Sequence, residues 1–122
     1  MLGTSSPHVI DVANAYATFA AQGIKSKPYL VSQVIGSNKG VLYEATPETQ
    51  EVFSKEVMAD LTYALKGTIT GGTGAAALGL GRPVAGKTGT SQSNASAWFS
   101  AYTPQIAAVS YTHLTLPTIY SV

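Results

Sequence analysis

Residues 87–90, with the sequence KTGT, combine a cation, two hydroxyls and a glycine in an order suited to chemistry on an anionic substrate. On an extended strand Thr88 and Thr90 share one face and Lys87 lies on the other. Two hydroxyls at this spacing can bind a carboxylate, and Lys87 can add positive charge and help to transfer a proton. Gly89 allows close packing, and the backbone N–H of Thr90 can donate to an oxyanion. The pattern suits acyl transfer on a substrate that carries a carboxylate, but so short a motif is weak evidence alone, and a surface turn with one lysine is the alternative.

The same stretch also matches a nucleotide-binding pattern. Residues 81–88, GRPVAGKT, fit Gly-x-x-x-x-Gly-Lys-Thr. A phosphate-binding loop of this kind follows a buried strand and opens a helix, whose first N–H groups face the phosphates. Here the loop follows the glycine-rich ALGLG and precedes TGTSQSNAS, which is poor in helix formers. No acidic residue that could hold magnesium follows Asp60. The context therefore argues against nucleotide binding.

Composition limits the other classes of function. The chain has 122 residues, which suits one domain or a piece of one. Of these residues 45% are hydrophobic and only 11% are charged, which suits a segment that lies mostly inside a larger protein. All six acidic residues lie within the first 60, so the second half is weakly basic, with no basic run and no series of aromatic residues. Nucleic-acid binding therefore has little support, whereas a small anion fits. Cysteine is absent, which excludes disulfides and thiolate metal sites.

Hydrophobic periodicity predicts two helices and a set of strands that would hold residues 87–90 in place. A glycine-rich loop with one helical turn, residues 71–81, is expected between the second helix and the strand that carries KTGT. Trp98 and Phe99 are expected to divide between a sheet face and the core. The expected helices are Pro7–Gln22 and Ser54–Ile69. The expected strands are Tyr29–Ile35, Val41–Glu44, Val84–Thr90 and Ala97–Tyr102, and residues Gln105–Tyr111 are expected to form the first part of another strand.

Several tracts, in a fixed order, resemble the transpeptidase domain of class A, bifunctional penicillin-binding proteins. They are VANAYATFAAQG (12–23), LVSQVIGSNKGVLYE (30–44), GGTGAAA (71–77) and VAGKTGTSQSNASAWFSAYTPQIA (84–107). Each tract is weak evidence alone, but together they cover about Leu2–Val109. The resemblance implies an α+β, penicillin-binding/β-lactamase-like transpeptidase fold, a mostly antiparallel sheet packed by helices, which is incomplete in this chain.

The resemblance also implies roles for the KTGT residues. Lys87 would be catalytic, while Thr88, Gly89 and Thr90 would bind substrate. The substrate would be a peptidoglycan stem peptide ending in D-Ala-D-Ala, and β-lactams would occupy the same place. No metal, organic cofactor or nucleic acid is implied. The parent protein would be anchored in the cytoplasmic membrane and act on its outer face, with its anchor and a glycosyltransferase domain outside this chain.

The chain departs from the family pattern in two ways. No Ser-x-x-Lys and no Ser-x-Asn occurs in the sequence, so the family's nucleophile and its second motif are missing. We therefore expect residues 1–109 to be the C-terminal part of a transpeptidase domain that is inactive alone. The segment 110–122, SYTHLTLPTIYSV, does not fit the family and is expected to be a non-native tail.

The sequence also allows other members of the penicillin-binding and β-lactamase group. A D,D-carboxypeptidase and a serine β-lactamase also carry Lys-Thr-Gly, although the tract WFSAYTP at residues 98–104 favours the class A transpeptidase. A non-catalytic module with a penicillin-binding fold is a further alternative. Residues 71–74 could border the cleft or form a plain loop, and the sequence does not separate the two.

Overall fold

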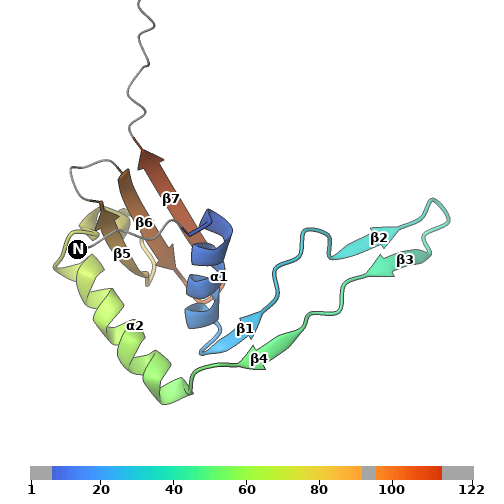
Figure 1. Ribbon diagram of the computed structural model, residues 1–122, viewed down its shortest axis with the longest axis horizontal. Helices are drawn as coiled ribbons and strands as arrows, with labels where there is room; N and C mark the ends of the chain where they lie inside the picture. The colour runs from blue at the N-terminus through green and yellow to red at the C-terminus, as the bar shows by residue number, and fades with distance from the viewer. Residues whose placement is uncertain (1–6, 92–95, 114–122) are drawn as a thin grey trace, which may run out of the picture.

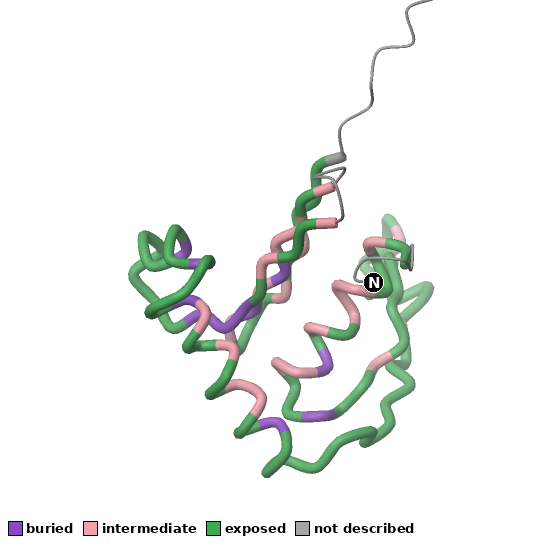
Figure 2. The backbone as a smooth tube through the Cα atoms, turned by 60° about the vertical axis from the view of Figure 1, so that its left-hand side comes forward, coloured by how far each residue is buried: buried purple, intermediate pink, exposed green. Residues whose placement is uncertain are grey.

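The computed structural model describes residues 7–91 and 96–113, which form a small sheet, two helices and a projecting arm. Helix α1 (Val9–Ala20) and helix α2 (Lys55–Thr70) lie on opposite sides of the sheet, as Figure 2 shows with the sheet nearly edge-on. A short 3-10 helix, η1 (Ala75–Leu80), follows α2 and leads into the sheet. This arrangement agrees with the expected α+β class.

The sheet contains β5 (Ala85–Thr90), β6 (Ser96–Tyr102) and β7 (Ala107–His113), in that spatial order and antiparallel throughout. Strand β5 pairs with β6 from Ala85 opposite Tyr102 to Thr90 opposite Ala97. Among the described residues no strand pairs with the other edge of β5. The strand that carries the KTGT residues is therefore an edge strand, with a register fixed on one side only.

The core lies mainly between α2 and the sheet. Ile69, Ala77 and Val84 are buried, and Phe99 packs against them from β6. On the opposite face the ring of Tyr102 contacts Tyr16 and Phe19 of α1, with centroids 6.2 and 6.3 Å apart. Neighbouring residues of β6 alternate between these two faces, so both helices pack on this strand. Tyr102 reaches both of them, because its hydroxyl lies 2.7 Å from the Thr62 hydroxyl of α2.

Trp98 and Phe99 divide between the faces as the sequence predicts. Phe99 joins the core under α2, while Trp98 stacks on Tyr111 of β7 with ring centroids 4.7 Å apart. Strand β7 thus includes residues 110–113 of the segment set apart as a tail, and these residues pair with β6. The domain boundary at residue 109 stays a prediction.

Helix α2 forms where the sequence predicts it, with Ser54 as its N-cap accepting a 3.4 Å hydrogen bond from the Val57 N–H. Helix α1 begins later than expected, because His8 is its N-cap and Pro7 lies before it. The predicted cap, Ser6, lies outside the described residues. Gly23, with a φ of +93°, directs its N–H to the Thr18 carbonyl at 2.9 Å and ends the helix as predicted.

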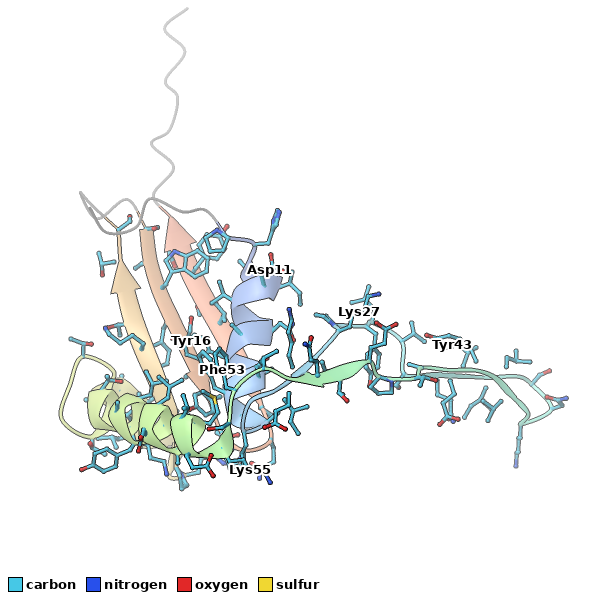
Figure 3. The ribbon with its side chains drawn as sticks, turned by 60° about the horizontal axis from the view of Figure 1, so that its bottom comes forward. Asp11, Tyr16, Lys27, Tyr43, Phe53 and Lys55 are labelled. Carbon is cyan, nitrogen blue, oxygen red and sulfur yellow. The ribbon has the colours of Figure 1, made fainter. Side chains whose placement is uncertain are left out.

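The arm consists of two antiparallel ribbons that extend away from the sheet (Figure 1). Strands β2 (Gln33–Ile35) and β3 (Val41–Glu44) form the predicted hairpin, but β2 is shorter than the expected strand Tyr29–Ile35. The ribbon of β1 (Ile24–Ser26) and β4 (Thr49–Glu51) was not predicted, since three polar-rich residues give no period-2 signal. Figure 3 shows Tyr43 on this arm, well away from α1 and the sheet.

The described helices are too short or too polar for any of them to cross a membrane.

Two glycines give opposite predictions for substitution by alanine. A Cβ on Gly23 would lie 2.1 Å from the Phe53 carbonyl oxygen, in a left-handed backbone conformation, whereas a Cβ on Gly67, inside α2, would meet nothing within 4 Å. We expect Gly23→Ala to lower the free energy of unfolding by at least about 2 kcal/mol. Gly67→Ala should raise it by about 0.5–1 kcal/mol. Urea denaturation followed by circular dichroism tests both, and a loss of stability in Gly67→Ala would contradict the packing described around α2.

Candidate functional site

Close packing of β5 on β6 fixes the strand immediately before the KTGT residues. A Cβ on Gly86 would lie 2.8 Å from both the Ala101 Cβ and the Ser100 carbonyl oxygen, so only glycine fits there without a shift of the neighbouring strand. The same residue is tied to α2, because the Thr68 hydroxyl donates to the Gly86 carbonyl. Strand β5 therefore enters the site held from the sheet and from the helix.

Along β5 the backbone N–H and C=O groups of successive residues point alternately toward β6 and toward the open edge. The hydrogen bond at Ser91, just after the strand, shows which residues point which way. The Ser91 N–H donates to the Ser96 carbonyl at 2.9 Å, so residue 91 points its backbone groups toward the β6 side. In an antiparallel pair the preceding residue points its N–H the other way, so the N–H groups of Thr90 and Thr88 face the open edge. The Thr88 carbonyl agrees, since it accepts from Lys87 Nζ at 2.8 Å rather than from β6.

The side chains of the KTGT residues also separate as the sequence predicts. Thr88 lies opposite Phe99 on the face toward α2, and Lys87 lies opposite Ser100 on the face toward α1. The Lys87 side chain folds back to the strand edge, which brings its ammonium group to the Thr88 carbonyl. Positive charge and outward-facing N–H groups thus meet at one edge.

A loop that follows α2 reaches the site. The Thr73 hydroxyl lies 2.5 Å from the Thr88 hydroxyl, within hydrogen-bond distance. The loop therefore contacts one KTGT residue, but none of residues 71–74 is among those that line the cleft around this strand, so their place at the cleft stays a prediction. The sequence marks Thr73 as one of four residues that could border the cleft, but it does not predict the contact with Thr88, which joins residues fifteen positions apart.

A cleft of about 530 Å³ holds Lys87, Thr88, Gly89 and Thr90 together. Its other walls come from β6 and from α1, which contributes Val12 and Tyr16. Figure 3 shows Tyr16 between α1 and the sheet.

Burial between these elements raises the pKa of the Tyr16 phenol above its usual value, and Tyr102 adds to the rise while Ser100 opposes it. Tyr16 is therefore a neutral group beside the cleft.

In the part of the chain that the structure describes, no three His, Cys, Asp or Glu side chains group as metal ligands. The arrangement offers two hydroxyls, an ammonium and outward N–H groups, which suits recognition of a carboxylate and an oxyanion. The edge also offers backbone groups to an extended peptide.

The described geometry is that of an edge strand whose outward N–H groups and one lysine lie beside a cleft. The family model of the penicillin binding protein transpeptidase domain matches residues 8–118. The chain therefore belongs to the penicillin-binding protein transpeptidase family.

Curated relatives agree with this assignment. Penicillin-binding protein 1A of Mycolicibacterium smegmatis is 39% identical over 114 residues, and that of Aquifex aeolicus is 35% identical over 105 residues. These matches cover 88% and 86% of this chain but only 14% of each relative. The chain thus spans about one seventh of the length of these relatives.

Solved structures share the fold. The penicillin-binding protein PonA1 of Mycobacterium tuberculosis matches with a TM-score of 0.66 and 32% identity, over 85% of this chain and 29% of that one. Penicillin-binding protein A of the same organism, as an imipenem acyl-enzyme complex, matches with a TM-score of 0.70 and 26% identity, over 89% of this chain and 26% of that one. The architecture is thus that of penicillin-binding protein transpeptidase domains.

The open edge of β5 predicts an alternating pattern of amide exchange. We expect the N–H groups of Lys87 and Gly89, which face β6, to exchange slowly, and those of Thr88 and Thr90 to exchange much faster. Hydrogen exchange followed by NMR measures each amide separately. Equal protection of Thr90 and Gly89 would contradict the open edge.

Proposed function

We propose that this chain carries the substrate-binding strand of a serine-type peptidoglycan D,D-transpeptidase. The observation that carries the proposal is the open edge of β5, where Lys87, Thr88, Gly89 and Thr90 line one cleft and the N–H groups of Thr88 and Thr90 face outward. Membership of the transpeptidase family supports it. The nucleophilic serine would come from outside these 122 residues, because the sequence contains no Ser-x-x-Lys.

In this proposal the donor is a stem peptide ending in D-Ala-D-Ala. The hydroxyls of Thr88 and Thr90 bind its terminal carboxylate, and the Thr90 N–H provides part of the oxyanion hole. The serine oxygen bonds to the carbonyl carbon of the penultimate residue, and the terminal D-Ala leaves with a proton on its nitrogen. An acceptor amine then displaces the serine and forms the cross-link. Lys87 supplies positive charge and takes part in proton transfer.

β-Lactams fit the same groups, because they carry a carboxylate beside a reactive amide carbonyl. The similarity to a penicillin-binding protein solved as an imipenem acyl-enzyme supports β-lactam binding by the parent protein. Since its substrate is cell-wall peptidoglycan, we propose that the parent works on the outer face of the cytoplasmic membrane and is anchored there.

Replacement of Lys87 should separate catalysis from folding. In the full-length protein we expect Lys87→Ala to slow acylation by a fluorescent penicillin by about 10²–10⁴-fold, the usual size of a proton-transfer contribution. Lys66→Ala, which removes an exposed lysine of α2, serves as the matched control and should leave the rate unchanged. Wild-type rates in Lys87→Ala would refute the role assigned to this lysine.

The isolated chain of 122 residues gives a second test. We expect no covalent labelling by fluorescent penicillin under conditions that label the full-length protein, because no activated nucleophile is present. Gel fluorescence after denaturation measures this directly. Clear labelling of the isolated chain would show that it holds a nucleophile of its own.

A further inference from the structure

We propose that Thr73 is a positioning residue, which donates a hydrogen bond to the Thr88 hydroxyl and so directs the Thr88 proton to the substrate carboxylate. This inference rests on the proposed function, since it assumes that Thr88 binds that carboxylate. It adds a residue from the loop after α2 to a site otherwise built from β5.

The direction of the hydrogen bond follows from proton counting. The two hydroxyl oxygens lie 2.5 Å apart, and either could donate in the free protein. A hydroxyl has one proton, and an ionised carboxylate only accepts. When Thr88 donates to the carboxylate, the proton in its contact with Thr73 must therefore come from Thr73. The series Thr73 to Thr88 to carboxylate also polarises each bond in the same direction, which strengthens the last one.

The backbone on both sides of Thr73 is packed too closely to move freely. A Cβ on Gly72 would lie 2.8 Å from the Thr68 carbonyl oxygen. A Cβ on Gly74 would lie 2.7 Å from the Ile69 Cδ1 and 3.4 Å from the Phe99 ring. The Gly74 N–H also donates to the Thr68 carbonyl at 3.0 Å. Thr73 is thus held between two glycines that pack on the end of α2.

The same helix end is attached to β5. The Thr68 hydroxyl donates to the Gly86 carbonyl, two residues before Thr88. Phe99, against which Gly74 packs, is the cross-strand neighbour of Thr88. The end of α2 is therefore attached to β5 and the loop packs on β6, so both elements that flank the hydroxyl pair are held against the sheet.

This role predicts an effect that depends on the ligand's charge. Benzylpenicillin carries the carboxylate, and its methyl ester lacks the negative charge but keeps the reactive ring. In the full-length protein we expect Thr73→Val to slow acylation by benzylpenicillin by about 3- to 10-fold, the size of one hydrogen bond, with little change for the ester. The ratio of the two second-order rate constants, measured by stopped-flow or competition labelling, is the readout.

Two further variants control for packing. Thr73→Ser keeps the hydroxyl and should retain the wild-type ratio. Thr70→Val removes a nearby exposed hydroxyl, which donates to the Lys66 carbonyl at 3.2 Å, and should change neither rate. An equal loss for acid and ester in Thr73→Val would show a purely structural role and overturn the inference, as would a Thr73→Ser ratio as low as that of Thr73→Val.

The ratio of the acid and ester rate constants also distinguishes failure of the proposed function from failure of this inference. If the wild-type protein shows no preference for the acid over the ester, or if Thr88→Val leaves the ratio unchanged, Thr88 does not bind the carboxylate. That result overturns the assignment of Thr88 and the inference with it. A ratio that falls in Thr88→Val but stays at the wild-type value in Thr73→Val overturns the inference alone.

Discussion

The one-sided hydrogen bonding of β5 is the constraint on which the candidate site depends. Strand β6 satisfies one edge of β5, and the close approach at Gly86 fixes the distance between them. On the other edge α2 satisfies only the Gly86 carbonyl, through Thr68. The N–H of Thr90 therefore faces the cleft side, which a central strand would not permit, because its donors would all be used in the ladder. An open edge normally invites unwanted pairing, and Lys87 on this edge opposes it.

The sequence predicted the strand that carries the KTGT residues well, because strand alternation depends only on residues adjacent in the chain. The alternation of Lys87 and Thr88 between two faces follows from strand geometry alone, and so does the division of Trp98 from Phe99. Contacts between distant residues were not predictable in this way. The Thr73–Thr88 contact arises only when α2 docks on the sheet, and the β1–β4 ribbon joins two short strands that flank the hairpin; no periodicity encodes either one.

The distribution of buried surface explains why the site is better defined than the arm. Apolar burial concentrates between α2 and the sheet, where Ile69 is 2% exposed. On the arm Leu30 and Leu42 are 100% and 72% exposed. Hydrophobic burial therefore stabilises β5 and the loop at Thr73, while the arm contributes little to their position. A change in the arm's conformation could leave the hydroxyl pair unaffected.

The positive charge of Lys87 is available to attract an anionic ligand. Within the described residues the one ion pair joins Lys27 to Glu48, on the arm, at 3.9 Å. Lys87 instead donates to a neutral carbonyl, and no carboxylate of the described residues forms an ion pair with it. The sequence has no acidic residue after Asp60, which leaves the cleft strand without a competing anion nearby in the sequence. An incoming carboxylate would therefore meet an uncompensated cation together with the hydroxyl of Thr88, whose proton direction Thr73 sets.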